Sequence, residues 1–313
     1  MQKNKIMTIQ KEVDSLLQSL QKVVFGKKNE IELIVTVLFA EGHVLIEDVP
    51  GTGKTVLAKA ISKAFGLDFK RIQMTPDLLP SDLTGSTVMK TDRSGFEFSK
   101  GPLFASIVLA DEINRASPKT LSAMLESMEE RQITVDGVTR DLPDPFLVIA
   151  TQNPVEHEGV FQLPCAQLDR FSARVALGYA DKESEIEILN SQNENHPLDD
   201  LKVYFNVEKI KQCINEARKV HISDLVQSYI VDLVRLTREN NSLIGVSTRG
   251  AIVLSRVARS RAWLKGRDYV LPDDIKELAI PVLAHRMMDE GGSLSRSQDR
   301  IKEILQSIPA PIA

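Results

Sequence analysis

Short apolar runs rich in β-forming residues alternate with stretches of helical periodicity up to about residue 180. This alternation predicts an α/β fold, in which a mostly parallel sheet is covered by helices. The predicted strands are His43–Glu47, Phe69–Met74, Ser106–Asp111, Phe146–Thr151 and Ala173–Leu177.

Two further segments, Ser86–Phe98 and Gln132–Asp141, have alternating side chains on either side of a turn. The turns are Asp92–Gly95 in the first segment and Asp136-Gly137 in the second. Both segments are typical of β-hairpins, here inserted into the α/β core.

Beyond about residue 180, helical periodicity replaces the strand pattern. Asp181–Asn190 is predicted to be helical, and the polar stretch Ser191–Asp200, which contains Pro197, marks a linker region. We therefore expect a core (1–180), a linker region (181–200) and an all-helical second domain (201–313). Its predicted helices are Val207–Val220, Ser223–Glu239, Ser247–Lys265 and Pro272–His285, with caps at Ser223, Ser247 and Leu271-Pro272.

Composition places the chain among globular proteins, with 42% hydrophobic and 26% charged residues in 313. The longest apolar stretches, such as Ile107–Ala110, fall far short of the roughly 18 residues that cross a bilayer. Met1–Gln10 has no apolar core behind its lysines, so we expect no secretory signal, no membrane insertion and a cytoplasmic protein. Cys165 and Cys213 are expected to be reduced, structural thiols.

The formal net charge of −4 gives no overall attraction to nucleic acid, and we expect no stable nucleic-acid binding. The segment Asn240–Arg267 nevertheless holds five arginines, one lysine and no acid. It would be either a nucleic-acid surface or a solvated or subunit-facing surface of the helical domain. The second interpretation is favoured, because Ile252, Val253, Val257, Trp263 and Leu264 make the segment amphipathic.

The segment Pro50–Thr55 (Pro-Gly-Thr-Gly-Lys-Thr) follows the apolar run Val44–Ile46. A strand, a glycine turn and a Lys-Thr pair at a helix start together predict a cradle for a nucleoside triphosphate. Lys54 would reach the β- and γ-phosphates and Thr55 the Mg²⁺ ion. The match is partial, because Asp48 stands where the general pattern has its first glycine.

Two more predicted strands end in candidate catalytic groups. Asp111 and Glu112 end an apolar strand and would serve as Mg²⁺ ligand and catalytic base, although Asn114, Ser117 and Pro118 also fit a helix cap after a strand end. Asn153 would orient the attacking water or touch the γ-phosphate, although for this residue taken alone an Asn-Pro turn, which needs no ligand, is the commoner explanation.

Arg170, before the last strand, and Arg249, at a helix start, are candidates for a guanidinium delivered to the γ-phosphate. For each arginine taken alone, a surface ion pair is the commoner explanation. His157 and Glu158 lack the spacing of a zinc site and are assigned no chemistry.

The order of these parts resembles the AAA+ ATPases, and more narrowly the MoxR family. The resemblance rests on Glu47–Gly51, Gly101–Leu103, Ala110–Ala116, Ala150–Pro154 and Leu168–Phe171 and covers nearly the whole chain. It also accounts for Asp48, because MoxR proteins commonly have an acid there. Cys165 departs from the family, which usually has glutamate in that stretch.

The resemblance implies a P-loop αβα sandwich followed by a helical lid, with ATP and Mg²⁺ as cofactors. It implies Lys54 and Thr55 for Walker A, Asp111 and Glu112 for Walker B, Asn153 for sensor 1, Arg170 for the arginine finger and Arg249 for sensor 2. It leaves open whether Arg249 serves its own or a neighbouring subunit, and whether Arg115 lies in an interface or in a surface ion pair. The nucleotide-binding residues expected on this basis are Val24, Phe25, Gly26, Pro50, Gly51, Thr52, Gly53, Lys54, Thr55 and Val56, with Val23 beside them.

The resemblance further implies a ring, typically a hexamer, in which Arg170 acts on the neighbour's nucleotide and the two hairpins face the central pore. The leading hypothesis is a chaperone that uses ATP to mature partner complexes, with a von Willebrand factor type A domain protein as the expected partner. A metal-inserting chelatase subunit is a close variant of it. The alternatives are a nucleic-acid motor and a nucleotide-gated assembly scaffold, which need the same residues.

Overall fold

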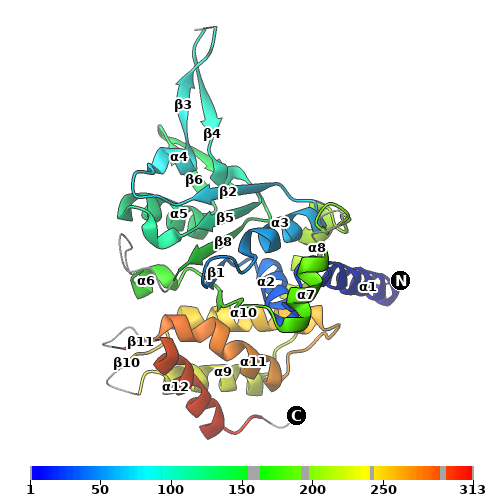
Figure 1. Cartoon of the computed structure of the whole chain (residues 1–313). Helices are drawn as coiled ribbons and strands as arrows, with labels where there is room; N and C mark the ends of the chain where they lie inside the picture. Colours follow the sequence, from blue (N-terminus) through cyan, green and yellow to red (C-terminus); the bar gives the residue numbers. More distant parts are fainter. Residues whose placement is uncertain are drawn as a thin grey trace.

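A five-stranded sheet with the order β2-β5-β8-β1-β9 lies at the centre of the computed structural model, which describes residues 2–92, 94–153, 163–191, 197–239, 243–289 and 294–311. Every neighbouring pair in this sheet is parallel, so the predicted α/β core is confirmed (Figure 1). The strands are β1 (Val44–Glu47), β2 (Phe69–Gln73), β5 (Ile107–Asp111), β8 (Leu147–Gln152) and β9 (Ala173–Val175).

Successive side chains of the strands enter two different hydrophobic clusters, one on each face of the sheet. Val44 and Ile46 pack in a cluster with α1, α2 and α3, whereas Leu45 packs in a second cluster with α4 and α5. Parallel strands buried on both faces explain why their sequences are continuously apolar. The helices are α1 (Gln2–Gln21), α2 (Lys28–Phe39), α3 (Lys54–Ala64), α4 (Pro80–Thr84), α5 (Pro118–Glu130) and the one-turn α6 (Cys165–Leu168).

Both predicted hairpins are present. The first pairs β3 (Gly85–Met89) with β4 (Phe96–Lys100) and projects well beyond the core (Figure 1). The second pairs β6 (Gln132–Val135) with β7 (Val138–Asp141).

Beyond α7 (Lys182–Ser191) the chain forms a helical lid, as expected, with one addition: β10 (Leu243–Ile244) and β11 (Met288–Asp289) form a two-residue antiparallel pair. The lid packs directly on the core, since Phe39 of α2 meets Trp263 edge to face at a centroid distance of 5.1 Å. None of the described helices is both long and apolar enough to cross a lipid bilayer. The remaining helices are α7 (Lys182–Ser191), α8 (Val207–Arg218), α9 (Asp224–Leu236), α10 (Thr248–Leu264), α11 (Pro272–Leu283) and α12 (Leu294–Ser307).

Helix caps follow the sequence signals in part. Ser223 accepts a hydrogen bond from the backbone N–H of Val226, as a cap should. Ser247 occupies the cap position of α10 but makes no such bond. Leu271 occupies the expected cap position of α11, but here the cap residue is the donor. Its N–H donates to the carboxylate of Asp274, within the helix, at 2.8 Å.

Candidate nucleotide-binding site

The loop between β1 and α3 turns through two glycines in the left-handed region, Gly51 at φ 86° and Gly53 at φ 85°. A Cβ added at either position would meet no atom within 4 Å, so the backbone conformation, not crowding, requires glycine there. Because α3 begins at Lys54, its unpaired first-turn N–H groups lie next to this loop. Such an arrangement fits an anion such as a phosphate.

Lys54 lies across the loop, since its Nζ donates to the carbonyl oxygens of Asp48 and Val49 at 3.0 and 2.9 Å. The buried carboxylate of Asp48 accepts from the N–H of Val49 at 2.8 Å and from the N–H of Gly178 at 2.6 Å. Asp48 therefore joins the glycine loop to the segment that follows β9. A glycine at this position would make neither bond.

Asp111 and Glu112 lie at the carboxyl end of β5, as predicted. Asp111 accepts from Thr151 Oγ1 at 2.5 Å and from Arg71 Nη2 at 2.7 Å. The same Thr151 hydroxyl oxygen accepts from the N–H of Glu112 at 2.9 Å. Glu112 has φ 57°, a left-handed conformation that costs an ordinary residue of order 1 kcal/mol or more.

The side chain of Glu112 is held by two neighbours. Its Oε2 accepts from Gln73 Nε2 at 3.0 Å and from Arg115 Nη1 at 3.1 Å. Arg115 therefore forms an ion pair within the chain, and its role in a subunit interface stays a prediction. Asn114, on the 3-10 turn Ile113–Arg115, is buried, whereas Ser117 caps α5 through the N–H of Thr120.

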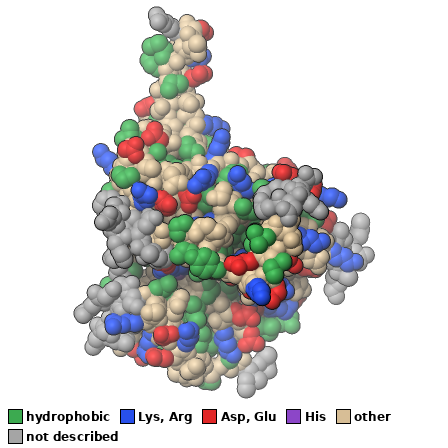
Figure 2. Space-filling view, in the orientation of Figure 1, with side chains coloured by type: hydrophobic (Ala, Val, Ile, Leu, Met, Phe, Trp, Pro, Cys, Tyr) green, Lys and Arg blue, Asp and Glu red, His purple; other side chains and the backbone are tan. Residues whose placement is uncertain are grey.

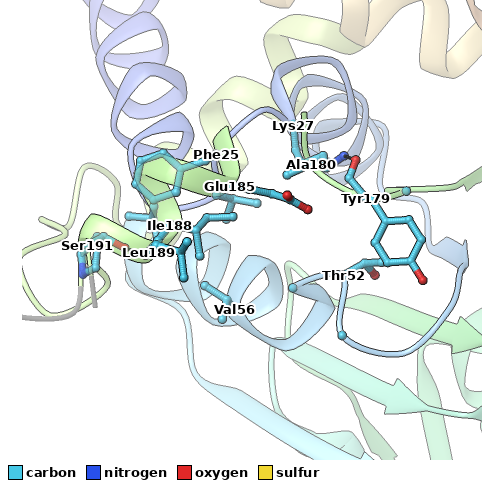
Figure 3. A pocket seen from close by; sticks show the side chains of 16 residues that line it. Phe25, Lys27, Thr52, Val56, Tyr179, Ala180, Glu185, Ile188, Leu189 and Ser191 are labelled. Carbon is cyan, nitrogen blue, oxygen red and sulfur yellow. Dashed lines mark hydrogen bonds between the residues drawn. The ribbon is translucent and has the colours of Figure 1, made fainter. Parts of the chain in front are cut away.

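A pocket of about 420 Å³ opens beside the glycine loop (Figure 3). Its volume lies in the range of small-molecule sites. Of the predicted nucleotide-binding residues, it is lined by Val24, Phe25, Gly51, Thr52, Gly53 and Val56, together with Val23. Gly26, Pro50, Lys54 and Thr55 do not line this pocket.

Gly26 does not line the pocket, but its lack of a side chain leaves room for α7 to approach. A Cβ at this position would lie 2.6 Å from Ser184 Oγ of α7. Its φ of 69° and this close approach both favour glycine. The helix α7 thereby reaches the pocket and forms one wall of it, where Glu185, Ile188 and Leu189 point inward (Figure 3). This wall was not predicted, because the polar sequence around α7 is typical of a linker region.

Arg170 and Arg249 lie at the opposite edge of the sheet from the glycine loop. The loop follows the carboxyl end of β1, whereas Arg170 precedes the amino end of β9, and the parallel register aligns Val44 with Ala173. Both arginines bind Glu129 near the end of α5: Arg170 Nε lies 2.9 Å and Arg249 Nη1 2.8 Å from its carboxylate. The structure thus gathers Lys54, Asp111, Glu112 and the buried Asn153 at one edge and the two arginines at the other.

A buried arginine in the lid holds the segment that carries Arg170. Arg286, 5% exposed, donates to Asp169 Oδ1 at 2.7 Å and to the carbonyl oxygen of Phe171 at 2.7 Å. Burial lowers its pKa to about 10, against the opposing effect of Asp169, so the guanidinium remains charged near neutral pH. No motif in the sequence distinguishes Arg286 from a surface arginine.

Two further pairs of residues were considered in the sequence, His157 with Glu158 and the two cysteines. His157 and Glu158 fall outside the described residues. Cys213 is buried, which raises its pKa to about 12, and burial also raises the pKa of the half-buried Cys165.

The described residues contain no group of three His, Cys, Asp or Glu side chains that would hold a metal ion. A site of this kind still suits Mg²⁺, which is commonly bound by one or two protein groups together with substrate phosphates. Thr55 and Asp111 supply oxygen atoms of the right chemical type, one at the start of α3 and one at the end of β5. The chain therefore fits an ion that arrives with its nucleotide.

Comparisons with known proteins identify the family of the chain. Residues 43–173 match the model of the ATPase family associated with various cellular activities (AAA), and residues 237–308 match the AAA lid domain. Protein YeaC of Bacillus subtilis is 45% identical over 95% of this chain and 94% of its own length. Chaperone MoxR1 of Mycobacterium tuberculosis is 36% identical over 93% of this chain and 80% of its own.

The crystal structure of a candidate ATPase from Cytophaga hutchinsonii superimposes with a TM-score of 0.91 and 39% identity. The match covers 99% of this chain and 98% of that one, so the shared fold includes both the core and the lid. With both AAA models matched and MoxR1 similar along most of its length, this chain belongs to the MoxR family of AAA+ ATPases.

Proposed function

We propose that this chain hydrolyses ATP with Mg²⁺ in a ring of identical subunits, typically a hexamer, and uses the energy to remodel partner proteins. One observation carries this proposal: Lys54, Asp111 and Glu112 lie at one edge of the sheet, and Arg170 and Arg249 at the other. Guanidinium groups on the far edge reach a γ-phosphate only if that phosphate belongs to a neighbouring subunit. Arg249 would then act in trans together with Arg170.

Within one subunit, the roles follow from position. The glycine loop and Lys54 would bind the phosphates, and the pocket walled by Phe25, Val56 and α7 would hold the adenine. Bound Mg²⁺, held by Thr55 and Asp111, would neutralise charge on the phosphates. Glu112 would accept a proton from the attacking water, and Asn153 would orient that water.

The remodelling role is supported by the similarity to Chaperone MoxR1 and by the hairpin β3–β4. This hairpin exposes Phe96 and Met89, which are 69% and 57% accessible, on an arm that extends away from the core (Figure 1). Exposed apolar side chains on a projecting arm suit contact with another protein. We propose that the arm faces the ring pore and that the partner contains a von Willebrand factor type A domain.

The test is ATPase activity per subunit as protein concentration rises, measured with mass in solution, in the wild type and in Arg170→Ala. We expect activity to climb as rings assemble and to fall by about 10³ in Arg170→Ala while ATP binding persists. Glu112→Gln should bind ATP and fail to turn it over. Activity that is independent of both concentration and Arg170 would rule out the shared site.

A further inference from the structure

The helix α7 is a largely uncovered part of this molecule. Of its ten residues, all of which the structure describes, Ser184 alone is buried. The helix exposes Ile186 at 48% and Leu189 at 69%, and Glu183 and Glu187 are also exposed. Figure 2 shows apolar and acidic side chains side by side over this helix. An apolar face with acidic flanks indicates a surface that another surface covers.

A cleft of about 1050 Å³ with the opposite charge lies between the lid and the far edge of the sheet. One face of α10 lines it with Arg249, Ile252, Arg256 and Arg259. These four are spaced three or four residues apart, so they form a single stripe along the helix. Ile252 is 54% exposed within this stripe, and Val231 of α9, 48% exposed, lies in the same cleft.

Two arginines of this stripe have no carboxylate partner among the described residues. Arg256 forms no ion pair there, and Arg259 donates only to a carbonyl oxygen while its Nε is buried without a hydrogen-bond partner. The other four cations of the segment Asn240–Arg267 all have carboxylate partners: Arg249 pairs with Glu129, Arg261 with Glu277, Lys265 with Glu32 and Arg267 with Asp274. The basic character seen in the sequence is therefore concentrated on the cleft.

We propose that the cleft of one subunit receives α7 of the next subunit in the ring. Glu183 and Glu187 would meet Arg256 and Arg259, and Ile186, which does not line the nucleotide pocket, would pack on Ile252 and Val231. The lengths agree, because Arg249 and Arg259 are about 15 Å apart along α10 and a ten-residue helix is about 15 Å long. Charge complementarity of this kind fixes register between partners.

Docking of α7 would connect the subunit contact to the nucleotide site. The same helix lines the nucleotide pocket through Ile188 and Leu189, and the same cleft contains Arg170 and Arg249. Docking of α7 would therefore bring a neighbour's arginines toward the nucleotide that α7 covers. The inference rests on the proposed ring but specifies which surfaces close it.

The test uses two charge reversals that leave the proposed catalytic residues intact. One variant carries Glu183→Lys and Glu187→Lys, and the other carries Arg256→Glu and Arg259→Glu. Glu185 is left unchanged because it lines the nucleotide pocket. The matched control is Asp299→Lys with Glu303→Lys on α12, which lines neither the pocket nor the cleft. Binding of ATP by the isolated subunits verifies folding.

Each variant alone should require at least about tenfold more protein to form rings, because like charges would face each other at every interface. A 1:1 mixture should assemble at nearly the wild-type concentration, since alternating subunits then present opposite charges everywhere. The control should assemble like the wild type.

Normal assembly of either variant, or failure of the mixture to recover, would overturn the docking of α7 and leave the proposed ATPase ring intact. A wild type that never assembles would overturn both. Salt-sensitive binding of single-stranded DNA, lost in Arg256→Glu with Arg259→Glu while rings still form, would assign the cleft to nucleic acid instead.

Discussion

Arg170 and Arg249 are 79 residues apart in the chain, yet both bind the carboxylate of Glu129, one on each oxygen. The first arginine belongs to the core and the second to the lid, so Glu129 links the two parts at the proposed subunit face. Without this carboxylate, the two guanidinium groups would repel each other and lose the acceptor that they share.

Glu129→Ala should therefore lower kcat of the assembled ring by about tenfold, which corresponds to the loss of roughly 1–2 kcal/mol of charge-assisted hydrogen bonding. KM for ATP and nucleotide binding by the isolated subunit should stay unchanged, because Glu129 lies at the edge opposite the glycine loop. Glu129→Gln, which keeps one accepting oxygen, should recover part of the rate.

The matched control for this prediction is Glu130→Ala. Glu130 is adjacent, exposed and without an ion pair in the part of the chain that the structure describes. A fall in kcat that is equal in both variants, or a change confined to KM, would show that Glu129 does not position the arginines.

Asp48 provides a second prediction, because its carboxylate holds the glycine loop to Gly178. Asp48→Gly would restore the general glycine-loop pattern but remove both hydrogen bonds of a buried carboxylate. We expect the free energy of unfolding to fall by about 2–3 kcal/mol and ATP affinity to weaken. Urea unfolding and nucleotide titration test this directly.

Asp48→Asn keeps the size of the side chain and one accepting oxygen, so its losses should be smaller than those of Asp48→Gly. If Asp48→Gly bound ATP more tightly than the wild type, the carboxylate of Asp48 would weaken nucleotide binding by the loop, contrary to this prediction.

The sequence predicted the sheet because its strands are short, apolar and buried on both faces, which leaves a strong local signal in runs such as Ile107–Ala110. The glycine loop and the Asp111–Glu112 pair were found for the same reason, since each is a contiguous motif. Both hairpins were found from alternation around a turn.

Features that depend on tertiary contacts were missed. The helix α7 lines the pocket only because Gly26 allows Ser184 to approach, which no local pattern reveals. Arg286 is buried in the lid yet holds Asp169 and Phe171 of the core across more than one hundred residues. Glu129 is an unremarkable helical acid until the fold places two arginines beside it.

Arg71 gives a prediction about metal affinity. Its guanidinium donates to Oδ2 of the Asp111 carboxylate at 2.7 Å and would therefore compete with Mg²⁺ for this oxygen atom. Arg71→Met should lower the Mg²⁺ concentration that gives half-maximal ATPase activity by about two- to fivefold, in keeping with a partly exposed ion pair worth up to ~1 kcal/mol.

The neighbouring Lys70 offers the control, because successive side chains of β2 point to opposite faces of the sheet. Lys70→Met should leave the Mg²⁺ requirement unchanged. An increased Mg²⁺ requirement in Arg71→Met would mean that Arg71 orients Asp111 for the ion and does not compete with it.

Stability should depend on pH through His43, a buried histidine immediately before β1. Its Nε2–H donates to the carbonyl oxygen of Met128 at 3.1 Å, and its Nδ1 accepts from the N–H of Val148 at 3.0 Å. Burial, assisted by the nearby positive charge of Arg131, lowers the pKa of His43 from 6.5 to about 3. The folded protein therefore keeps this ring neutral under conditions in which the unfolded chain protonates it.

Because the unfolded state binds the extra proton, the contribution of His43 is complete above pH 6.5 and is lost as pH falls from 6.5 toward 3. Within this window one such group changes the free energy of unfolding by up to about 1.4 kcal/mol per pH unit. His285, whose pKa burial also holds well below 6.5, adds a loss of the same sign. Urea unfolding between pH 7.5 and 4.5 should show this decline.

His43→Gln separates the proton from the packing, since glutamine offers both an acceptor and a donor but does not titrate. The variant should be less stable at pH 7.5. Below pH 6.5, its free energy of unfolding should depend less steeply on pH than that of the wild type, by up to about 1.4 kcal/mol per pH unit. Ile149→Val, a core substitution expected to cost about 0.5–1.5 kcal/mol, should lower the whole curve and keep its slope. Equal slopes in His43→Gln and the wild type would show that His43 does not drive the acid sensitivity.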